Sequence, residues 1–193
     1  MPDAKSDPLL EKIIPAAEEL IKTEHFSVEN LCHAVDRSLR DVVAAIGSID
    51  ELILHVNFRF MGAYLEKAKN ASDKAPNDLQ AVKDISNAWL DHAMANPQGV
   101  HVLLQHKWDD GFERPDWYLK RVMECFVPAE KHLRALAPKA SPDVVTGLAR
   151  GLYAHTCGLY FLSTNERAKA AGILSLKKLL DLHVDITVKG LQS

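Results

Sequence analysis

Apolar residues recur at every third or fourth position along most of the chain, which is the period of an amphipathic α-helix. Convincing strand-like alternation of apolar and polar residues does not appear, nor does a hairpin turn of the Asn-Gly type. The pattern therefore predicts an all-α protein of about nine helices, over residues 8–23, 27–35, 38–46, 48–70, 77–95, 97–106, 114–137, 142–163 and 167–190.

Several predicted helix ends carry residues that favour them physically. Ser48 and Glu51 form a capping box, in which each side chain satisfies a free backbone N–H of the other. Asn96-Pro97 predicts the end of one helix and the start of the next, because proline restricts the residue before it and fits a first helical turn. Ser141-Pro142 starts a further helix for the same reason.

The composition is that of an ordinary globular protein, with 193 residues, 25% of them charged and 47% hydrophobic. Three scattered cysteines favour neither a disulfide framework nor a CxxC metal site. The uncharged run over residues 151–165 is shorter than the roughly 20 residues of a membrane span. No export signal opens the chain, so we expect a cytoplasmic protein without a membrane partner.

Residues 20–52 carry the frame of a helix-turn-helix DNA reader, and this frame resembles the TetR family of bacterial repressors. Matching apolar and junction positions are Ile13, Ala16, Ala17, Leu20, Ile21, Phe26, Val28, Leu31, Ala34, Ile46, Gly47, Ser48, Asp50, Glu51 and Leu52. The resemblance implies a DNA-binding domain over residues 1–47 and a ligand-binding and dimerisation domain over residues 48–193. It further implies a homodimer that binds double-stranded DNA and a small hydrophobic effector, with no cofactor and no enzymatic activity.

The chain departs from the family where the DNA contacts fall. The segment from Phe26 to Gly47 is three residues shorter than usual, and Asp36 stands at the turn position that usually holds glycine. Asp tolerates left-handed backbone geometry, so the turn is still allowed. The recognition stretch 41–45 (DVVAA) offers few groups that hydrogen-bond a base edge. The DNA-binding candidates that remain are Ser27, Arg37, Ser38, Arg40 and Ser48.

Charge adds to this departure. Residues 1–60 hold eleven acidic and six basic residues, whereas DNA binding draws much of its affinity from Lys and Arg on phosphates. Arg37 and Arg40 have an alternative role, as partners of Asp36 and Asp41 on a solvated turn. The alternative function is a TetR-fold protein that has lost DNA binding and binds a lipid or small molecule.

Small residues recur on one face of the penultimate predicted helix, at Gly147, Gly151, Ala154 and Gly158. Glycine inside a helix costs roughly 1 kcal/mol relative to alanine, so this face suggests the close approach of another helix. We predict a dimer interface there, shared with the last helix through Ile173, Leu176, Leu180 and Val184. Tight packing within one subunit is the alternative.

Ligand-pocket candidates are the aromatic, Met and His residues of the middle region, although such residues more often form core. They are Phe60, Met61, Tyr64, Trp89, His92, His101, His106, Trp108, Trp117, Met123 and Tyr153. No His-Glu-x-x-His or CxxC spacing supports a metal site at the histidines. No nucleophile elbow or phosphate loop supports an enzyme, and Cys125 and Cys157 have no neighbouring base in the sequence.

Overall fold

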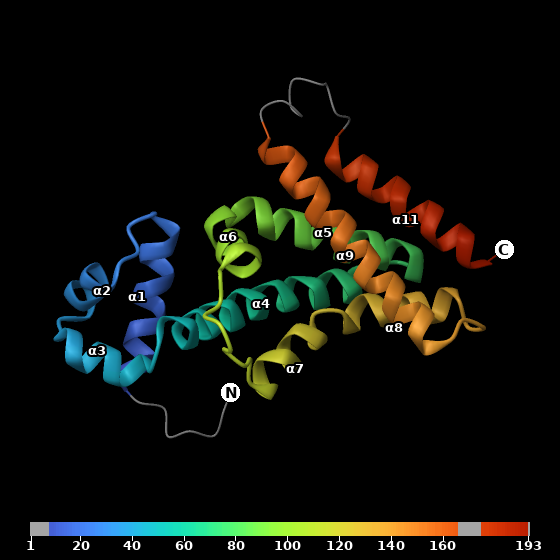
Figure 1. Cartoon of the computed structure of the whole chain (residues 1–193). Helices are drawn as coiled ribbons and strands as arrows, with labels where there is room; N and C mark the ends of the chain where they lie inside the picture. The colour runs from blue at the N-terminus through green and yellow to red at the C-terminus, as the bar shows by residue number, and fades with distance from the viewer. Residues whose placement is uncertain (1–7, 166–174, 193) are drawn as a thin grey trace. The chain divides into compact units, whose positions relative to one another are not determined.

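The computed structural model describes residues 8–165 and 175–192, and within these ranges it contains ten helices and no strand (Figure 1). The all-α, TetR-like prediction is confirmed. The helices are α1 (Leu10–Lys22), α2 (Val28–Val35), α3 (Leu39–Ile46), α4 (Ile49–Lys74), α5 (Asp78–Ala95), α6 (Pro97–Gln105), α7 (Asp116–Glu124), α8 (Val127–Leu136), α9 (Pro142–Thr164) and α11 (Leu176–Gln192).

Two predicted helices differ from the structure. The segment predicted as one helix over 114–137 is two, α7 and α8, separated at Cys125 and Phe126. Pro128 lies in the first turn of α8, where it lacks the N–H that a continuous helix would need. The helix predicted over 167–190 is described only from Leu176, because residues 166–174 lie outside the described ranges.

The chain divides into two compact units, the first formed by Met1–Gly62 with Asn96–Arg121 and the second by Ala63–Ala95 with Val122–Ser193. The division falls inside α4, after Gly62. The boundary after residue 47 between a DNA-binding domain and a ligand-binding and dimerisation domain stays a prediction. The core of the first unit is built from α1 to α4, and its buried residues include Ile13, Ala17, Leu31, Val42, Ile46 and Leu52.

The second unit is built around α5, which α8, α9 and α11 contact. Its core contains Val82, Leu133, Val145, Ala149, Leu152, Val184 and Val188. Polar side chains connect α5 to α11 at three points: Lys83 to Asp185 at 2.7 Å, Asn87 to Asp181 at 2.9 Å, and Asp91 to Lys177 at 2.8 Å. No helix among the described residues is long and apolar enough to cross a membrane.

Candidate functional site

The helix-turn-helix of the first unit consists of α2, a short turn and α3. The turn contains Asp36, whose backbone is left-handed at φ 52° and ψ 56°, as its place at the usual glycine position predicts. The side chains of the three candidate serines cap helices. Ser27 accepts a hydrogen bond from the amide of Asn30, Ser38 from that of Asp41 and Ser48 from that of Glu51.

Helix α3 presents a mixed apolar and charged outer face. Val42 and Ile46 are buried in the core of the first unit, whereas Leu39 and Val43 are 59% and 45% exposed. Arg40 is exposed on the same helix. The outer face of the recognition helix therefore combines one guanidinium group with exposed aliphatic side chains.

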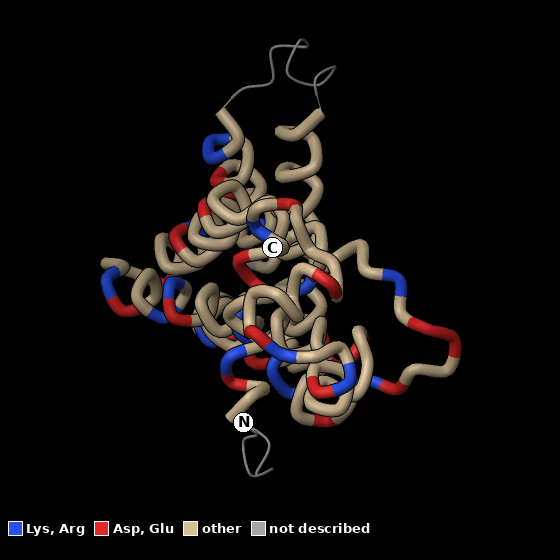
Figure 2. The backbone as a smooth tube through the Cα atoms, turned by 90° about the vertical axis from the view of Figure 1, so that its left-hand side faces the viewer, with Lys and Arg blue, Asp and Glu red and all other residues tan. Residues whose placement is uncertain are grey.

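Arg37 and Arg40 do not pair with the neighbouring carboxylates. Arg37 donates a hydrogen bond to the backbone carbonyl of Asp36 at 2.8 Å. Among the described residues, Arg40 has no ion-pair partner, and Asp41 instead accepts a hydrogen bond from the Ser38 hydroxyl at 2.7 Å. In Figure 2 acidic and basic positions are interspersed along the chain. Helix α2 contains no Lys or Arg, and α3 contains one, Arg40. The two arginines are therefore available to phosphates, on a surface that is otherwise poor in positive charge.

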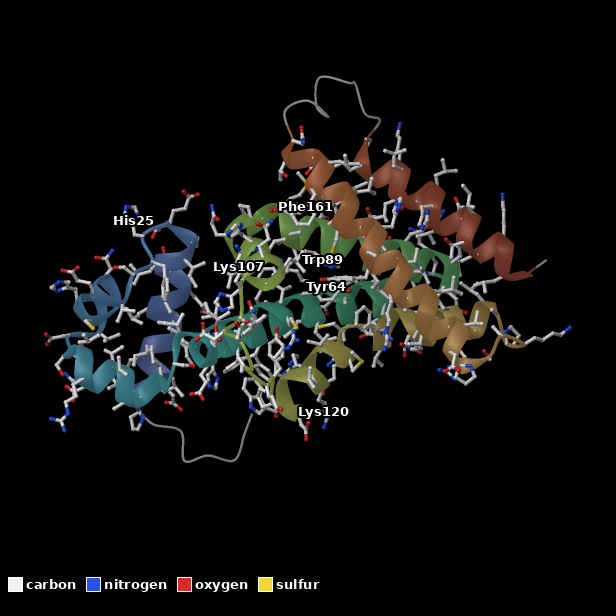
Figure 3. The ribbon with its side chains drawn as sticks, viewed as in Figure 1. His25, Tyr64, Trp89, Lys107, Lys120 and Phe161 are labelled. Carbon is white, nitrogen blue, oxygen red and sulfur yellow. The ribbon has the colours of Figure 1, made fainter. Side chains whose placement is uncertain are left out.

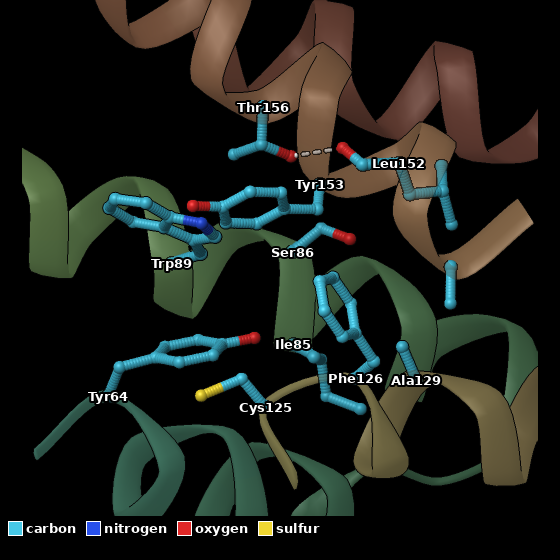
Figure 4. A pocket seen from close by; sticks show the side chains of 11 residues that line it. Tyr64, Ile85, Ser86, Trp89, Cys125, Phe126, Ala129, Leu152, Tyr153 and Thr156 are labelled. Carbon is cyan, nitrogen blue, oxygen red and sulfur yellow. Dashed lines mark hydrogen bonds between the residues drawn. The ribbon is translucent and has the colours of Figure 1, made fainter. Parts of the chain in front are cut away.

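A cavity of about 30 Å³ lies inside the second unit, between α4, α5, α9 and the α7–α8 junction (Figure 4). This is room for roughly one or two water molecules, far below the ~300 Å³ or more of a typical ligand pocket. Tyr64 and Trp89 project into this region from α4 and α5 (Figure 3). The cavity is lined by Tyr64, Ile85, Ser86, Trp89, Cys125, Phe126, Ala129, Ala149, Leu152, Tyr153 and Thr156.

Aromatic rings form much of the wall. The ring of Trp89 stacks on that of Tyr153 with centroids 5.7 Å apart, and it lies 6.0 Å from the ring of Tyr64. Phe126 meets Tyr153 edge-on at 5.6 Å. Such offset and edge-to-face arrangements are the ones that aromatic side chains prefer.

The polar groups of the wall are neutral. Burial raises the pKa of Tyr64, and the thiols of Cys125 and Cys157 raise it further. Burial also raises the pKa of Tyr153. The charge of Cys157 and a hydrogen bond with its thiol raise this pKa further. Both phenols are therefore uncharged hydrogen-bonding groups at any physiological pH.

Three of the predicted pocket residues line this cavity, namely Tyr64, Trp89 and Tyr153. His92 is buried beside two of them, 6.4 Å from the ring of Tyr64 and 6.5 Å from that of Trp89. Met123 is exposed, and its sulfur accepts a hydrogen bond from Arg150 at 3.6 Å.

The other predicted pocket residues belong to the first unit. Met61 is buried, and the ring of Phe60 lies against Gly99 of α6. Trp117 stacks on His55 at 5.2 Å, while Trp108 contacts His106 and Phe112. His101 is exposed on α6.

Sequence reasoning missed the small neutral part of the wall, which includes Ser86, Cys125, Ala129 and Thr156. These residues look like ordinary helix positions in the sequence. A signal that could have found one of them is Pro128, since it ends α7 early and so brings Cys125 and Phe126 to the cavity in a turn. No group of three or more potential metal ligands occurs among the described residues.

One face of α9 lies open. Gly147, Gly151, Ala154 and Gly158 are all exposed, and a Cβ added at any of the three glycines would meet no atom within 4 Å. Val144, Phe161 and Leu162 are exposed large apolar residues of the same helix, and Phe161 is visible near its end in Figure 3. Packing within the described part of the subunit therefore does not account for these glycines.

The predicted partner residues on α11 lie differently. Leu180 and Val184 are completely buried inside the second unit, and Leu176 is half-buried. The exposed apolar residues of α11 are Leu182 and Ile186. Ile173 lies outside the described residues.

Comparison with solved structures shows which known folds this architecture resembles. No family model and no curated protein matches the chain. Among solved structures, similarity extends to a protein of unknown function from Rhodococcus sp. RHA1, with a TM-score of 0.74, 13% identity and full coverage of both chains. The TetR family transcriptional regulator PfmR from Thermus thermophilus aligns with a TM-score of 0.59 at 15% identity, covering 95% of this chain and 98% of its own.

A TetR variant from Acinetobacter baumannii AYE, solved in complex with minocycline, aligns with a TM-score of 0.62 at 11% identity and 97% coverage of each chain. The chain thus has the fold of TetR family transcriptional regulators.

Proposed function

We propose that this protein is a homodimeric TetR-like transcriptional regulator whose DNA binding is controlled by a small hydrophobic effector. The observation that carries the proposal is the course of α4. Helix α3 ends at Ile46 with Gly47 as its C-cap, and α4 begins at Ile49. The same helix α4 places Tyr64 in the wall of the cavity. In the family mechanism, effector binding moves this helix. An effector can act in this way only if it binds the two states with different affinity.

The open face of α9 supports the dimer. Its glycines allow close approach of a second helix, and its exposed apolar residues are of the kind that an interface covers. On α11 such an interface would use Leu182 and Ile186, since Leu180 and Val184 are occupied in the subunit core. A two-fold dimer also suits a palindromic operator.

The proposal is tested by retention of genomic DNA fragments on the protein at low salt, followed by salt titration of a retained fragment. Arg37→Ala and Arg40→Ala are each expected to weaken binding and to reduce the salt slope by about one for each phosphate that the variant no longer neutralises. Lys189→Ala, which removes an exposed positive charge from α11, is the matched control. If no fragment is retained at low salt, the regulator proposal fails.

A second function is favoured by the outer face of α3, where Leu39 and Val43 are exposed beside Asp41. These groups suit a phosphate backbone poorly. In this alternative the protein has given up DNA and uses the second unit to bind a small molecule. It predicts a co-purified apolar ligand by native mass spectrometry together with the absence of DNA retention.

A further inference from the structure

We infer that the cavity of the second unit binds an uncharged single-ring aromatic molecule that carries a hydroxyl group, the chemical class of the phenols. This inference rests on the proposed role of the cavity as an effector site, and it adds the class of ligand. Three properties of the cavity wall support it: its lack of charged side chains, its aromatic surfaces, and two hydroxyl groups that the described residues leave without partners.

No charged side chain contributes to the described wall, since its eleven residues include no Asp, Glu, Lys, Arg or His. A buried titratable group close to the wall is His92, whose Nδ1 lies 3.2 Å from Nζ of Lys67. The His92 side chain is not part of the wall, and its ring lies 6.4 Å from that of Tyr64 and 6.5 Å from that of Trp89. The wall residues therefore offer a carboxylate or ammonium ligand no opposite charge to replace the hydration that it loses.

The wall offers aromatic surface on more than one side of the cavity. Trp89 and Tyr153 stack on each other on one side, and the ring of Tyr64 lies on the other side of the space (Figure 4). Phe126 closes a third side. A flat ring inserted here gains offset or edge-on contacts with several of these side chains, which a branched aliphatic group of equal size does not.

Two hydroxyls of the wall are open to a ligand. Among the described residues, neither the Tyr64 hydroxyl nor the Ser86 hydroxyl has a hydrogen-bond partner, although both residues are largely buried. Thr156, in contrast, already donates to the carbonyl of Leu152 at 2.8 Å. A ligand hydroxyl both donates and accepts, so it can form hydrogen bonds with these two groups.

The size of the cavity limits the ligand to a small one. The cavity has a volume of about 30 Å³. This is too small for a benzene ring, since an engineered protein cavity that binds benzene has a volume of ~150 Å³. Binding therefore enlarges the cavity, and each added ligand atom requires further displacement of packed side chains. A single ring needs the least displacement, whereas a long acyl chain or a multi-ring compound needs far more.

The test is calorimetric titration of the whole protein, free of DNA, with four probes of similar size: phenol, toluene, benzoate and benzylammonium at pH 7. Phenol is expected to bind at least tenfold tighter than either charged probe and roughly three- to tenfold tighter than toluene. Equal or tighter binding of benzoate or benzylammonium overturns the inference, as does equal binding of toluene. Failure of all four probes to bind overturns it as well.

Tyr64→Phe is expected to lower the affinity for phenol roughly three- to tenfold and to leave that for toluene unchanged. The matched control is Tyr160→Phe, the same change at a buried tyrosine of the second unit outside the cavity wall. A Tyr64→Phe protein that binds phenol as wild type does would contradict the assigned hydroxyl. The probe series on the wild type tests the inference even if this variant does not fold.

These outcomes are distinct from those of the regulator proposal. A protein that binds phenol but retains no DNA keeps this inference and refutes the regulator. A protein that does not bind phenol, and whose DNA complex dissociates when a charged or long-chain compound is added, refutes this inference and supports the regulator.

Discussion

The imidazole of His106 donates a hydrogen bond from Nε2 to the carboxylate of Asp50 at 2.6 Å, and the backbone amide of Asp109 donates to the other carboxylate oxygen at 2.9 Å. Burial raises the pKa of Asp50, but these two hydrogen bonds and the charge of His106 together lower it below its usual range. Asp50 lies in the first turn of α4, where a negative charge also suits the helix dipole. The segment after α6 is thus held to the start of the helix that follows α3.

His106→Ala is expected to destabilise the protein by roughly 1–3 kcal/mol, because it leaves one oxygen of a buried carboxylate without its donor. The shift of the urea unfolding midpoint measures the effect. His101→Ala, at an exposed histidine of α6, is the control and is expected to change stability little. Equal midpoints for the two variants would show that the Asp50–His106 bond contributes nothing.

Ser38→Ala tests whether Ser38, a candidate DNA contact, stabilises the fold as the N-cap of α3. The Ser38 hydroxyl caps α3, so its removal is expected to cost about 1 kcal/mol of stability, measured by urea unfolding without DNA. Ser38→Asn keeps a capping side chain and is expected to restore most of this loss. A Ser38→Ala protein as stable as wild type would show that this cap does not stabilise the fold.

Local features of the fold were predictable from the sequence, because each depends on neighbouring residues. The left-handed turn at Asp36 and the cap of α4 at Ser48 follow from side-chain chemistry within four positions. Helix ends at Asn96 and Ser141 follow from the prolines beside them.

Features that depend on distant partners were not predictable. Asp50 and His106 are 56 residues apart, and no local pattern connects them. The break at Cys125 was missed because apolar residues stand on both sides of it, Met123 before it and Phe126 and Val127 after it. The wall position of Ser86 depends on which way α5 turns towards α9, which the polar side chain alone does not reveal.

The rings of His155 on α9 and His183 on α11 stack with centroids 3.7 Å apart and planes at 8°. Burial, and then the charge of His183, lower the pKa of His155. Its Nε2 has no hydrogen-bond partner among the described residues. Because its pKa is lower in the folded protein, His155 binds a proton more readily in the unfolded chain. The contribution of neutral His155 to folding stability is therefore complete above the unfolded pKa of about 6.5, and it is lost as the pH falls through the lower folded pKa.

His183→Gln is therefore expected to reduce the loss of stability between about pH 7.5 and pH 5, as followed by urea unfolding at several pH values. The difference should be below about 1 kcal/mol, since His155 is partly exposed and solvent screens the pair. Burial lowers the pKa of His55 too, so only the difference between variant and wild type is informative. A slope unchanged from wild type would contradict the coupling, and His101→Gln provides the baseline.

Gly151 lies on the open face of α9, so a side chain added there is expected to stabilise the single subunit but to weaken a dimer formed through this face. In an isolated subunit an alanine Cβ meets no atom within 4 Å, so Gly151→Ala should stabilise the helix by roughly 1 kcal/mol. In a dimer that brings a second helix to this face, Gly151→Leu should instead weaken association, seen by sedimentation velocity as a shift from dimer to monomer. Gly62→Ala, at another helical glycine with open space, should leave the mass unchanged. A Gly151→Leu protein that remains dimeric would place the interface elsewhere, because a leucine cannot be accommodated where two helix backbones approach closely.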